Sequence, residues 1–311
     1  MATALGKTQI EKGTRPAAAV ELTVEGVLAA ALPGKGAAAV YAFAPLHTGA
    51  LTPGSQEQNL REAEQVAKAI GAALGDVAQR ARTVTLVIPD ACVRVFVLDF
   101  DSLPAKAAEV VPVVKFRLRK MVPFDVEHAG VSYQILTETK SDCRALIAVT
   151  PGPILAEYEA AVRAAGYEPG AVLPSSLAAL AALDTDEAAL IACLSGGALT
   201  TAITHGQDLL LYRTLELPSD AAGWPGERAS ERASEVQRDI AVAAAYFEDK
   251  LGARPMRLHY SGSVAAEEFA RAVNDPTLEV VELAARPATG AATTLGRLSF
   301  AGIAGALAGA A

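Results

Sequence analysis

Aromatic residues are scarce in this sequence. Its 311 residues include a single Trp, and aromatic side chains make up 5% of a chain that is 51% hydrophobic. Ala, Val and Leu dominate the apolar class, which suits close packing of helices on sheets and disfavours a large ring-stacking ligand site. The chain is long enough for two domains that each bury a core of their own.

An excess of basic residues is also lacking. The formal net charge is −8, whereas a nucleic-acid-binding protein needs a basic face and a positive balance. Nucleic acid is therefore not expected as a partner.

Long hydrophobic runs are missing as well. No uncharged apolar run reaches the roughly 20 residues that span a bilayer, and the nearest, 298–311, is short and consists mostly of Ala and Gly. Glu21 and Glu25 interrupt the apolar stretch near the N-terminus, which argues against a signal peptide. We expect a cytoplasmic protein with no direct transmembrane segment.

Cysteine usage gives no sign of a disulfide framework or a metal site. Cys92, Cys143 and Cys193 are odd in number and widely spaced, without a C-x-x-C pair. The four His residues have no ligand-like spacing either. We expect the cysteines to be small core residues and expect no bound metal.

Apolar alternation and turn residues predict a first βββαβ unit. The sequence has strand patterns at 17–22, 26–32 and 37–44, a helical pattern at 56–74 and a further strand at 83–89.

The same order of elements recurs in the second half. Strand patterns at 188–194, 199–204 and 208–215 precede a helix at 231–252 and a strand at 256–260. Two such units predict an α/β protein with a duplicated ribonuclease-H-like fold of the actin/Hsp70 type, in which a nucleotide lies between the halves. This inference rests on the order of elements alone.

Extra material separates the two units. A strand at 92–100, a helix at 103–121 opened by Ser102 and Pro104, and strands at 131–136 and 144–149 predict an inserted βαββ subdomain at about 90–150.

These patterns divide the chain into three parts. We expect a first lobe at 1–178 that includes the inserted subdomain, a second lobe at 179–295, and a C-terminal helix at 296–311 that packs on the core. Helices at 152–165 and after Pro174 lead from the first lobe into the second.

The central segment carries two specific motifs, Met121-Val122-Pro123-Phe124 at the end of a helix and Tyr133-Gln134-Ile135-Leu136 in a strand. These motifs resemble the "YIPF" turn and the "DYQVL" strand of the PilM family of type IV pilus assembly proteins. Val236 to Ile240, followed by Tyr246-Phe247, is similar to the family's "EI-RSL-YF" helix. The resemblance covers nearly the whole chain, with the specific motifs in the centre.

The resemblance implies an actin-like scaffold similar to the cell-division protein FtsA. Members of the family are cytoplasmic and bind the cytosolic N-terminal peptide of an inner-membrane pilus protein, PilN. In related proteins the peptide lies between the first lobe and the inserted subdomain, which corresponds here to elements of 83–150. The type II secretion protein GspL is an adjacent relative, so pilus and secretion systems both stay open.

The resemblance also locates two nucleotide motifs, each altered here. Relatives carry an Asp followed by a Gly-rich turn, which hold the metal and the phosphates respectively. The first unit instead has Glu21 and a turn with Glu25 and Gly26, so that negative charge lies where phosphate approaches.

In the second unit Cys193 replaces the Asp, and a neutral thiol does not order a metal. Candidate nucleotide contacts remain in the second half, at Gly196, Gly197, Thr200 and Gly262.

Three functional hypotheses follow from these motifs. The leading one is a non-catalytic scaffold of a pilus assembly platform, without a cofactor, recruited to the inner membrane by a partner peptide. The alternatives are an ATP-binding or ATP-hydrolysing protein of a secretion system, which would use Mg-ATP, and a cytoskeletal polymer-former.

A basic cluster gives the candidate partner-binding residues. Lys115, Arg119 and Lys120 lie with Arg117 in a stretch that has no acid between Val110 and Asp125, and Phe124 follows them. A solvated helix end explains such a cluster as well. The functional alternatives are a rim beside the docking groove or attraction to the anionic leaflet.

Overall fold

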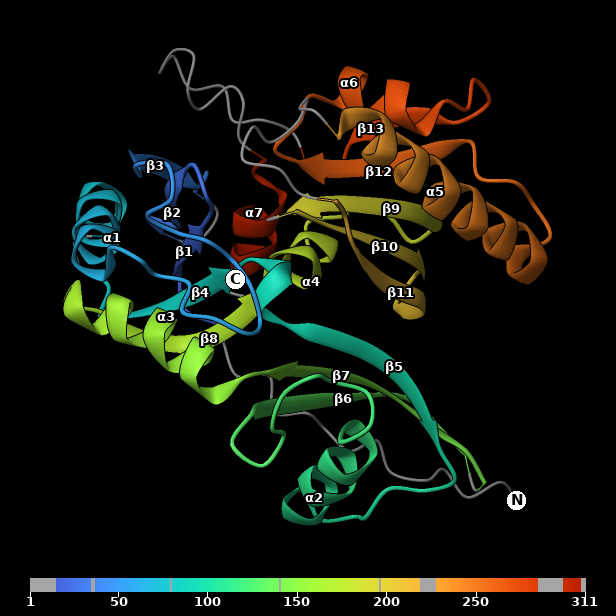
Figure 1. The fold of residues 1–311 in the computed structure, drawn as a ribbon, viewed down its shortest axis with the longest axis horizontal. Helices are drawn as coiled ribbons and strands as arrows, with labels where there is room; N and C mark the ends of the chain where they lie inside the picture. The colour runs from blue at the N-terminus through green and yellow to red at the C-terminus, as the bar shows by residue number, and fades with distance from the viewer. Residues whose placement is uncertain are drawn as a thin grey trace.

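The computed structural model describes residues 15–34, 37–78, 80–139, 141–195, 197–218, 228–284 and 299–308. Figure 1 shows two lobes side by side, with a smaller subdomain below them.

The first lobe is built on a five-stranded sheet with the order β3-β2-β1-β4-β8. Strands β1 to β3 form an antiparallel meander, and β4 and β8 extend it in parallel. The strands are β1 Ala18–Leu22, β2 Gly26–Ala31, β3 Val40–Pro45, β4 Thr83–Ile88 and β8 Glu168–Pro174.

The second lobe repeats this topology. Its sheet has the order β11-β10-β9-β12-β13, again with an antiparallel meander followed by two parallel strands. The strands are β9 Ala188–Ser195, β10 Ala198–His205, β11 Asp208–Glu216, β12 Arg257–Gly262 and β13 Glu279–Glu282. The predicted duplicated actin-type fold is therefore confirmed.

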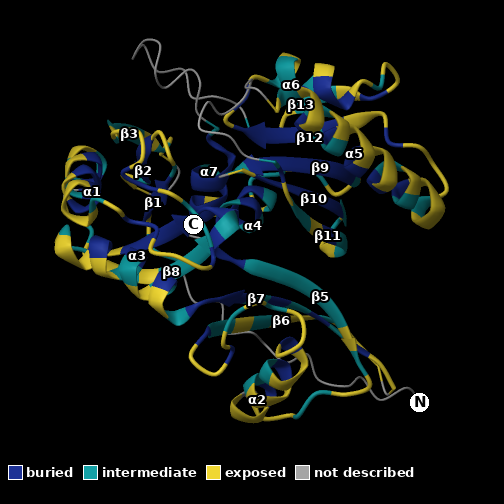
Figure 2. Ribbon diagram, in the orientation of Figure 1, coloured by how far each residue is buried: buried dark blue, intermediate teal, exposed yellow. Residues whose placement is uncertain are grey.

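Each sheet is covered on its outer face by two helices. Helices α1 (Ala63–Val77) and α3 (Gly152–Ala164) share a core with the first sheet. Helices α5 (Ala229–Leu251) and α6 (Ala266–Val273) do the same for the second sheet. Strands β1 and β9 are thus buried on both faces, which explains their nearly continuous apolar sequence (Figure 2).

Two short helices lie between the sheets. Helix α4 (Ser175–Leu180) follows the last strand of the first lobe, and α7 (Ala301–Ala308) comes at the end of the described chain. Helix α7 packs on the first sheet through Phe300, Ile303 and Leu307, whereas Ala301 faces the second-lobe core. Residues 296–298 and 309–311 of the predicted C-terminal helix lie outside the described residues.

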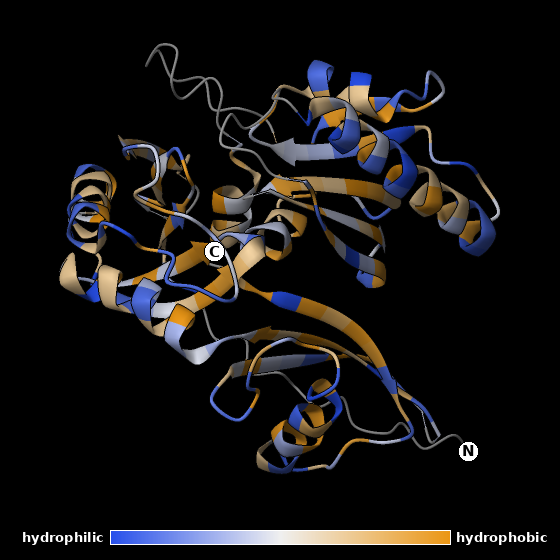
Figure 3. Cartoon of the chain, in the orientation of Figure 1, coloured by the Kyte–Doolittle hydropathy of each residue, from blue (hydrophilic) through white to orange (hydrophobic). Residues whose placement is uncertain are grey.

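The inserted subdomain has the predicted βαββ order. Strand β5 (Arg94–Phe100), helix α2 (Ala107–Leu118), β6 (Gly130–Glu138) and β7 (Cys143–Thr150) form a three-stranded sheet of order β5-β7-β6, with α2 on one face. Hydrophobic side chains line β5 and β7 for most of their length (Figure 3).

Several element boundaries differ from those predicted. The helix predicted at 56–74 begins at Ala63, because 51–62 forms a loop held by side-chain hydrogen bonds. The helix predicted at 103–121 begins at Ala107 and ends at Leu118. Strands β8 and β13 and helix α6 were not predicted.

The α4–α7 contact requires a residue without a side chain. A Cβ added at Gly305 of α7 would lie 1.8 Å from the carbonyl oxygen of Ala178 in α4, closer than any real contact. The two helices can therefore approach this closely only with Gly at this position.

We predict that Gly305→Ala lowers the free energy of unfolding by about 1–3 kcal/mol, the range typical of overpacking. Gly75→Ala is the matched control, since Gly75 also lies in a helix but has nothing within 4 Å of an added Cβ. The control substitution should leave the free energy of unfolding unchanged or raise it by roughly 0.5–1 kcal/mol. Urea denaturation of both variants measures the difference, and equal stabilities would contradict the proposed contact.

Candidate functional site

Glu21, at the first-lobe position where the family resemblance implies a metal-ordering Asp, is enclosed by protein. Glu21 lies on β1, on the face toward α4 and α7, and is 5% exposed. The hydroxyl of Ser175, at the start of α4, donates to its Oε1 over 2.6 Å. A Cβ added at Gly302 would lie 2.4 Å from the same oxygen, so α7 covers this carboxyl group directly.

A second buried acid lies nearby, just after β4. Asp90 is 2% exposed, and its Oδ1 accepts hydrogen bonds from the backbone N–H and the hydroxyl of Ser176, at 3.1 and 2.7 Å. The Ser176 hydroxyl also hydrogen bonds to the Tyr212 hydroxyl of β11. This chain of contacts joins the first lobe, α4 and the second lobe.

Burial shifts both acids toward the protonated form. Desolvation raises the pKa of Glu21 to about 7; the hydrogen bond from Ser175 opposes this shift, and the negative charge of Asp90 adds to it. Desolvation likewise raises the pKa of Asp90 to about 6, against the opposing hydrogen bonds from Ser176. One oxygen of each carboxyl group, Oε2 and Oδ2, is buried without a hydrogen-bond partner among the described residues. A protonated carboxyl group tolerates such a position better than a charged one.

The second lobe presents neutral groups to the same region. Cys193 of β9 is buried, and burial, Asp90 and Glu21 all raise the pKa of its thiol. Thr200, predicted as a nucleotide contact, is 1% exposed and hydrogen bonds to Thr214 over 3.0 Å. We call Glu21, Asp90, Ser175, Ser176, Cys193 and Tyr212 the interlobe cluster.

The candidate glycines lie at strand ends around this cluster. Gly197, in the β9–β10 turn, has a φ of +82°, and Gly196 lies outside the described residues. Gly26 begins β2, where an added Cβ would lie 2.5 Å from the Ala44 carbonyl oxygen. Gly262 ends β12, where a Cβ would lie 2.2 Å from the Tyr260 hydroxyl oxygen. Close packing of the chain itself thus accounts for Gly26 and Gly262.

The described residues do not fit Mg-ATP held in the manner of the actin fold. The first-lobe acid is covered by α7 and bonded to Ser175, and the second-lobe position carries a thiol. Within the ranges that the structure describes, no group of three or more His, Cys, Asp or Glu residues is placed to hold a metal ion.

The four candidate partner-binding residues separate into two groups. Lys115 donates to the backbone oxygen of Glu127 over 2.7 Å, and Arg119 pairs with the Glu127 carboxylate at 2.6 Å. Phe124 is half-buried against the subdomain core. Lys120 is exposed and contacts none of these groups. The structure does not bring the four together as one rim.

The inserted subdomain is packed against the first turn of α3. A Cβ added at Gly152 would lie 2.1 Å from the His128 carbonyl oxygen, and one at Gly130 would lie 2.7 Å from Leu155. The backbones of the subdomain and the first lobe are therefore in close contact along 128–130.

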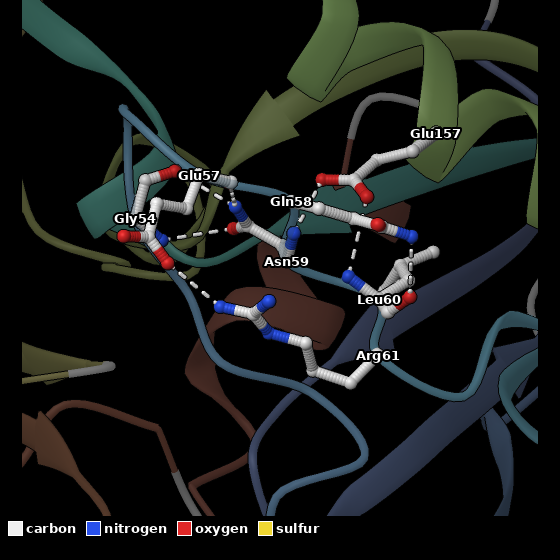
Figure 4. A network of polar contacts seen from close by, with 7 residues as sticks. All are labelled: Gly54, Glu57, Gln58, Asn59, Leu60, Arg61 and Glu157. Carbon is white, nitrogen blue, oxygen red and sulfur yellow. Dashed lines mark hydrogen bonds and ion pairs between the residues drawn. The ribbon is translucent and has the colours of Figure 1, made fainter.

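One buried amide organises the loop beside this junction (Figure 4). Asn59 is fully buried; its Nδ2 donates to the Gly54 and Glu57 carbonyl oxygens, and its Oδ1 accepts from the Gly54 N–H. The Glu157 carboxylate of α3 accepts hydrogen bonds from the backbone N–H groups of Asn59 and Leu60, at 2.8 and 3.2 Å. The loop is thus fastened to α3.

The subdomain is also tied to the second lobe. Arg94 of β5 pairs with Glu216 of β11 and donates to Ser55 of the loop. Arg144 of β7 donates to the Leu210 carbonyl oxygen over 3.3 Å. The orientation of the subdomain thus depends on contacts with both lobes.

Sequence reasoning missed most of the interlobe cluster. Asp90 and Tyr212 lie in no recognised motif, and the Ser176 hydroxyl joins them only because the two lobes face each other across α4.

Comparison with solved structures finds the same fold in proteins of pilus and secretion systems. The chain is similar to the protein of the PilM–PilN type IV pilus biogenesis complex, with a TM-score of 0.73 and 18% identity over 96% of this chain and 99% of that one. It is also similar to the cytoplasmic domain of EpsL, an inner-membrane component of the Vibrio cholerae type II secretion system, with a TM-score of 0.51 and 12% identity over 93% and 94%. The resemblance to PilM noted in the sequence is therefore confirmed at the level of the fold.

Sequence comparison alone finds no relative. No protein-family profile matches the chain, and no curated protein matches it. In the described part of the chain, no helix combines the length and apolarity needed to cross a bilayer.

We predict that Glu21 makes the protein less stable as the pH rises. The folded-state pKa of Glu21 is about 7, above the ordinary value of 4.5. The contribution of protonated Glu21 to the free energy of unfolding is therefore fully present below pH 4.5 and is lost as the pH rises through about 7. A shift of this size corresponds to about 3 kcal/mol. Glu21→Gln, which mimics the protonated form, should flatten the decline in unfolding free energy between about pH 5 and pH 8.

The control for this experiment is Glu64→Gln, at an exposed acid in the first turn of α1. It should leave the pH dependence of urea unfolding unchanged. Parallel pH profiles for Glu21→Gln and the unmodified protein would contradict the assignment of a raised pKa.

Proposed function

We propose that this chain is a non-catalytic, PilM-like scaffold of a type IV pilus assembly platform. It docks the cytosolic N-terminal peptide of a PilN-like inner-membrane protein. On this proposal it works in the cytoplasm and associates with the inner membrane peripherally, through that partner. Pilus assembly is preferred over type II secretion because the fold is more similar to the PilM–PilN protein than to EpsL.

The observation that best supports a role without catalysis is the interlobe cluster. Its two acids are enclosed by α4 and α7, one oxygen of each is already bonded to a serine, and raised pKa values favour their neutral forms. A metal-bound phosphate needs accessible, charged carboxylates and a glycine turn beside them. The cluster instead serves as an internal contact between the lobes.

The placement of the inserted subdomain supports docking. The subdomain is fixed to α3, to the 51–62 loop and to β11, so the junction between it and the first lobe is built from preorganised elements. A preorganised surface loses little conformational entropy when a peptide binds. Elements of 83–150 at this junction are the proposed peptide site.

Lys115 and Arg119 are the charged residues proposed to contact the peptide. Both lie on the side of α2 that faces the 119–129 connection, where Glu127 positions them. A basic pair held in place by an acid can receive an acidic or carbonyl group of a peptide without reorganising.

We predict that isothermal titration calorimetry with Mg-ATP will show no binding at millimolar nucleotide. Restoring a carboxylate with Cys193→Asp alone should not create binding, because α7 still covers Glu21. Heat that fits sub-millimolar affinity in the unmodified protein would instead favour the alternative function of an ATP-binding actin-like protein.

A second prediction concerns the partner peptide. The labelled N-terminal cytosolic peptide of the pilus membrane protein encoded beside this chain should bind in fluorescence anisotropy at micromolar concentration. Lys115→Gln should weaken binding by roughly three- to tenfold, as expected for one charged interface contact. Lys68→Gln is the control, since Lys68 is exposed and lies on α1, at a distance from α2 in Figure 1.

The outcome that would count against docking is an absence of binding at high micromolar peptide. Equal loss of affinity in Lys115→Gln and Lys68→Gln would retain docking but refute a specific contact with Lys115.

A further inference from the structure

Helix α2 carries apolar residues on two opposite faces. Val110, Val114 and Leu118 face inward and are buried in the subdomain core. Val113 and Phe116 face outward, where they are 38% and 73% exposed. The inner stripe alone explains why the helix packs on the sheet, so the outward apolar residues need another explanation.

Basic residues surround these outward apolar side chains. Arg117 is adjacent to Phe116 in α2, and Lys120 and Met121 lie in the turn that follows the end of the helix at Leu118. Met121 is 38% exposed. Neither Arg117 nor Lys120 makes a hydrogen bond or ion pair with any residue in the described ranges. We call Val113, Phe116, Arg117, Lys120 and Met121 the outer face of α2.

The outer face is accessible in the folded protein. Figure 1 shows α2 on the side of the subdomain sheet that points away from both lobes. In Figure 3 apolar and polar residues alternate along this helix. Lys115 and Arg119, the proposed peptide contacts, face the 119–129 connection, and the Arg119 guanidinium lies 5.8 Å from the centre of the Phe116 ring, so the two surfaces adjoin.

The charge of the outer face is opposite to that of the whole protein. The chain carries a net charge of −8, yet four basic residues and no acid lie between Val110 and Asp125. Two of these four residues, Lys115 and Arg119, are bonded to Glu127, so Arg117 and Lys120 carry the positive charge of the outer face. A positive patch on an acidic protein favours a negatively charged partner and orients the protein toward it.

The shape and composition of the patch favour lipid over an acidic peptide. The apolar residues lie on the outward side of a helix, and a flat bilayer surface can meet such a helix. Phe at the headgroup boundary, flanked by Lys and Arg that reach phosphate groups, is the pattern of helices that lie on membranes.

We propose that the outer face of α2 binds the surface of a membrane that contains anionic phospholipid. Phe116 and Val113 enter the headgroup region, and Arg117 and Lys120 pair with lipid phosphates. This contact goes beyond the peptide docking proposed above and does not depend on it. One aromatic residue and a few charges give weak, reversible binding, which becomes effective when another contact already holds the protein near the membrane.

The test is flotation of the full chain with vesicles, in the absence of any partner protein. Phosphatidylcholine vesicles with phosphatidylglycerol should retain the protein at low salt, and vesicles of phosphatidylcholine alone should not. Binding should be lost at about 1 M NaCl, where charges are screened beyond about 3 Å. Phe116→Ser and Lys120→Glu should each reduce the partition coefficient by roughly tenfold.

Two control variants are matched to these changes. Met256→Ser removes a side chain that is 70% exposed on the second lobe, and Lys68→Glu reverses an exposed charge on α1. Both should partition like the unmodified protein, and all four variants should retain its thermal unfolding midpoint.

Three results would overturn the proposal. These are no flotation of the unmodified protein with anionic vesicles, flotation unchanged by Phe116→Ser and Lys120→Glu, or equal losses in the control variants. Concentration-dependent dimerisation that Phe116→Ser abolishes, without vesicle binding, would assign the face to a second copy of the chain instead. Because no peptide is present, none of these results bears on the proposed docking function.

Discussion

The close approach of α4 and α7 is the constraint on which the arrangement of the lobes depends. These helices lie between the two sheets, and each contacts both lobes: Ala178 and Ile303 pack toward the first sheet, and Ala179 and Ala301 toward the second. Small residues where α4 and α7 cross allow the two helices to approach this closely. The sheets are consequently held at a separation that leaves Glu21 and Asp90 inside protein.

The same packing explains the chemistry of the interlobe cluster. A carboxylate that faces water can serve a metal ion, whereas one enclosed by helices is stabilised by protonation and by neutral donors. Ser175 and Ser176 supply such donors from the first turn of α4, and Cys193 adds no charge. The cluster is thus a polar contact suited to holding two lobes together, which agrees with a scaffold more than with an enzyme.

The duplicated architecture could be predicted from sequence because the strands and long helices have clear periodicity. The meanders, α3, α5 and the inserted subdomain lie within a few residues of their predicted positions. The helix start at Ala63 could not be predicted, since it depends on Asn59 and Glu157, which are 98 positions apart. The interlobe cluster could not be predicted for the same reason, because Ser176 joins Asp90 and Tyr212, which are far apart in the sequence.

The two halves differ most in the connection between the fourth strand of each unit and the helix that follows it. In the first half, residues 89–151 separate β4 from α3, whereas in the second half residues 263–265 connect β12 to α6. The fold therefore tolerates a domain of some sixty residues at this corner without changing the order of its sheet. The short turn at 263–265 is the pseudosymmetric insertion site, where a reporter or binding module could be grafted while the inserted subdomain stays free.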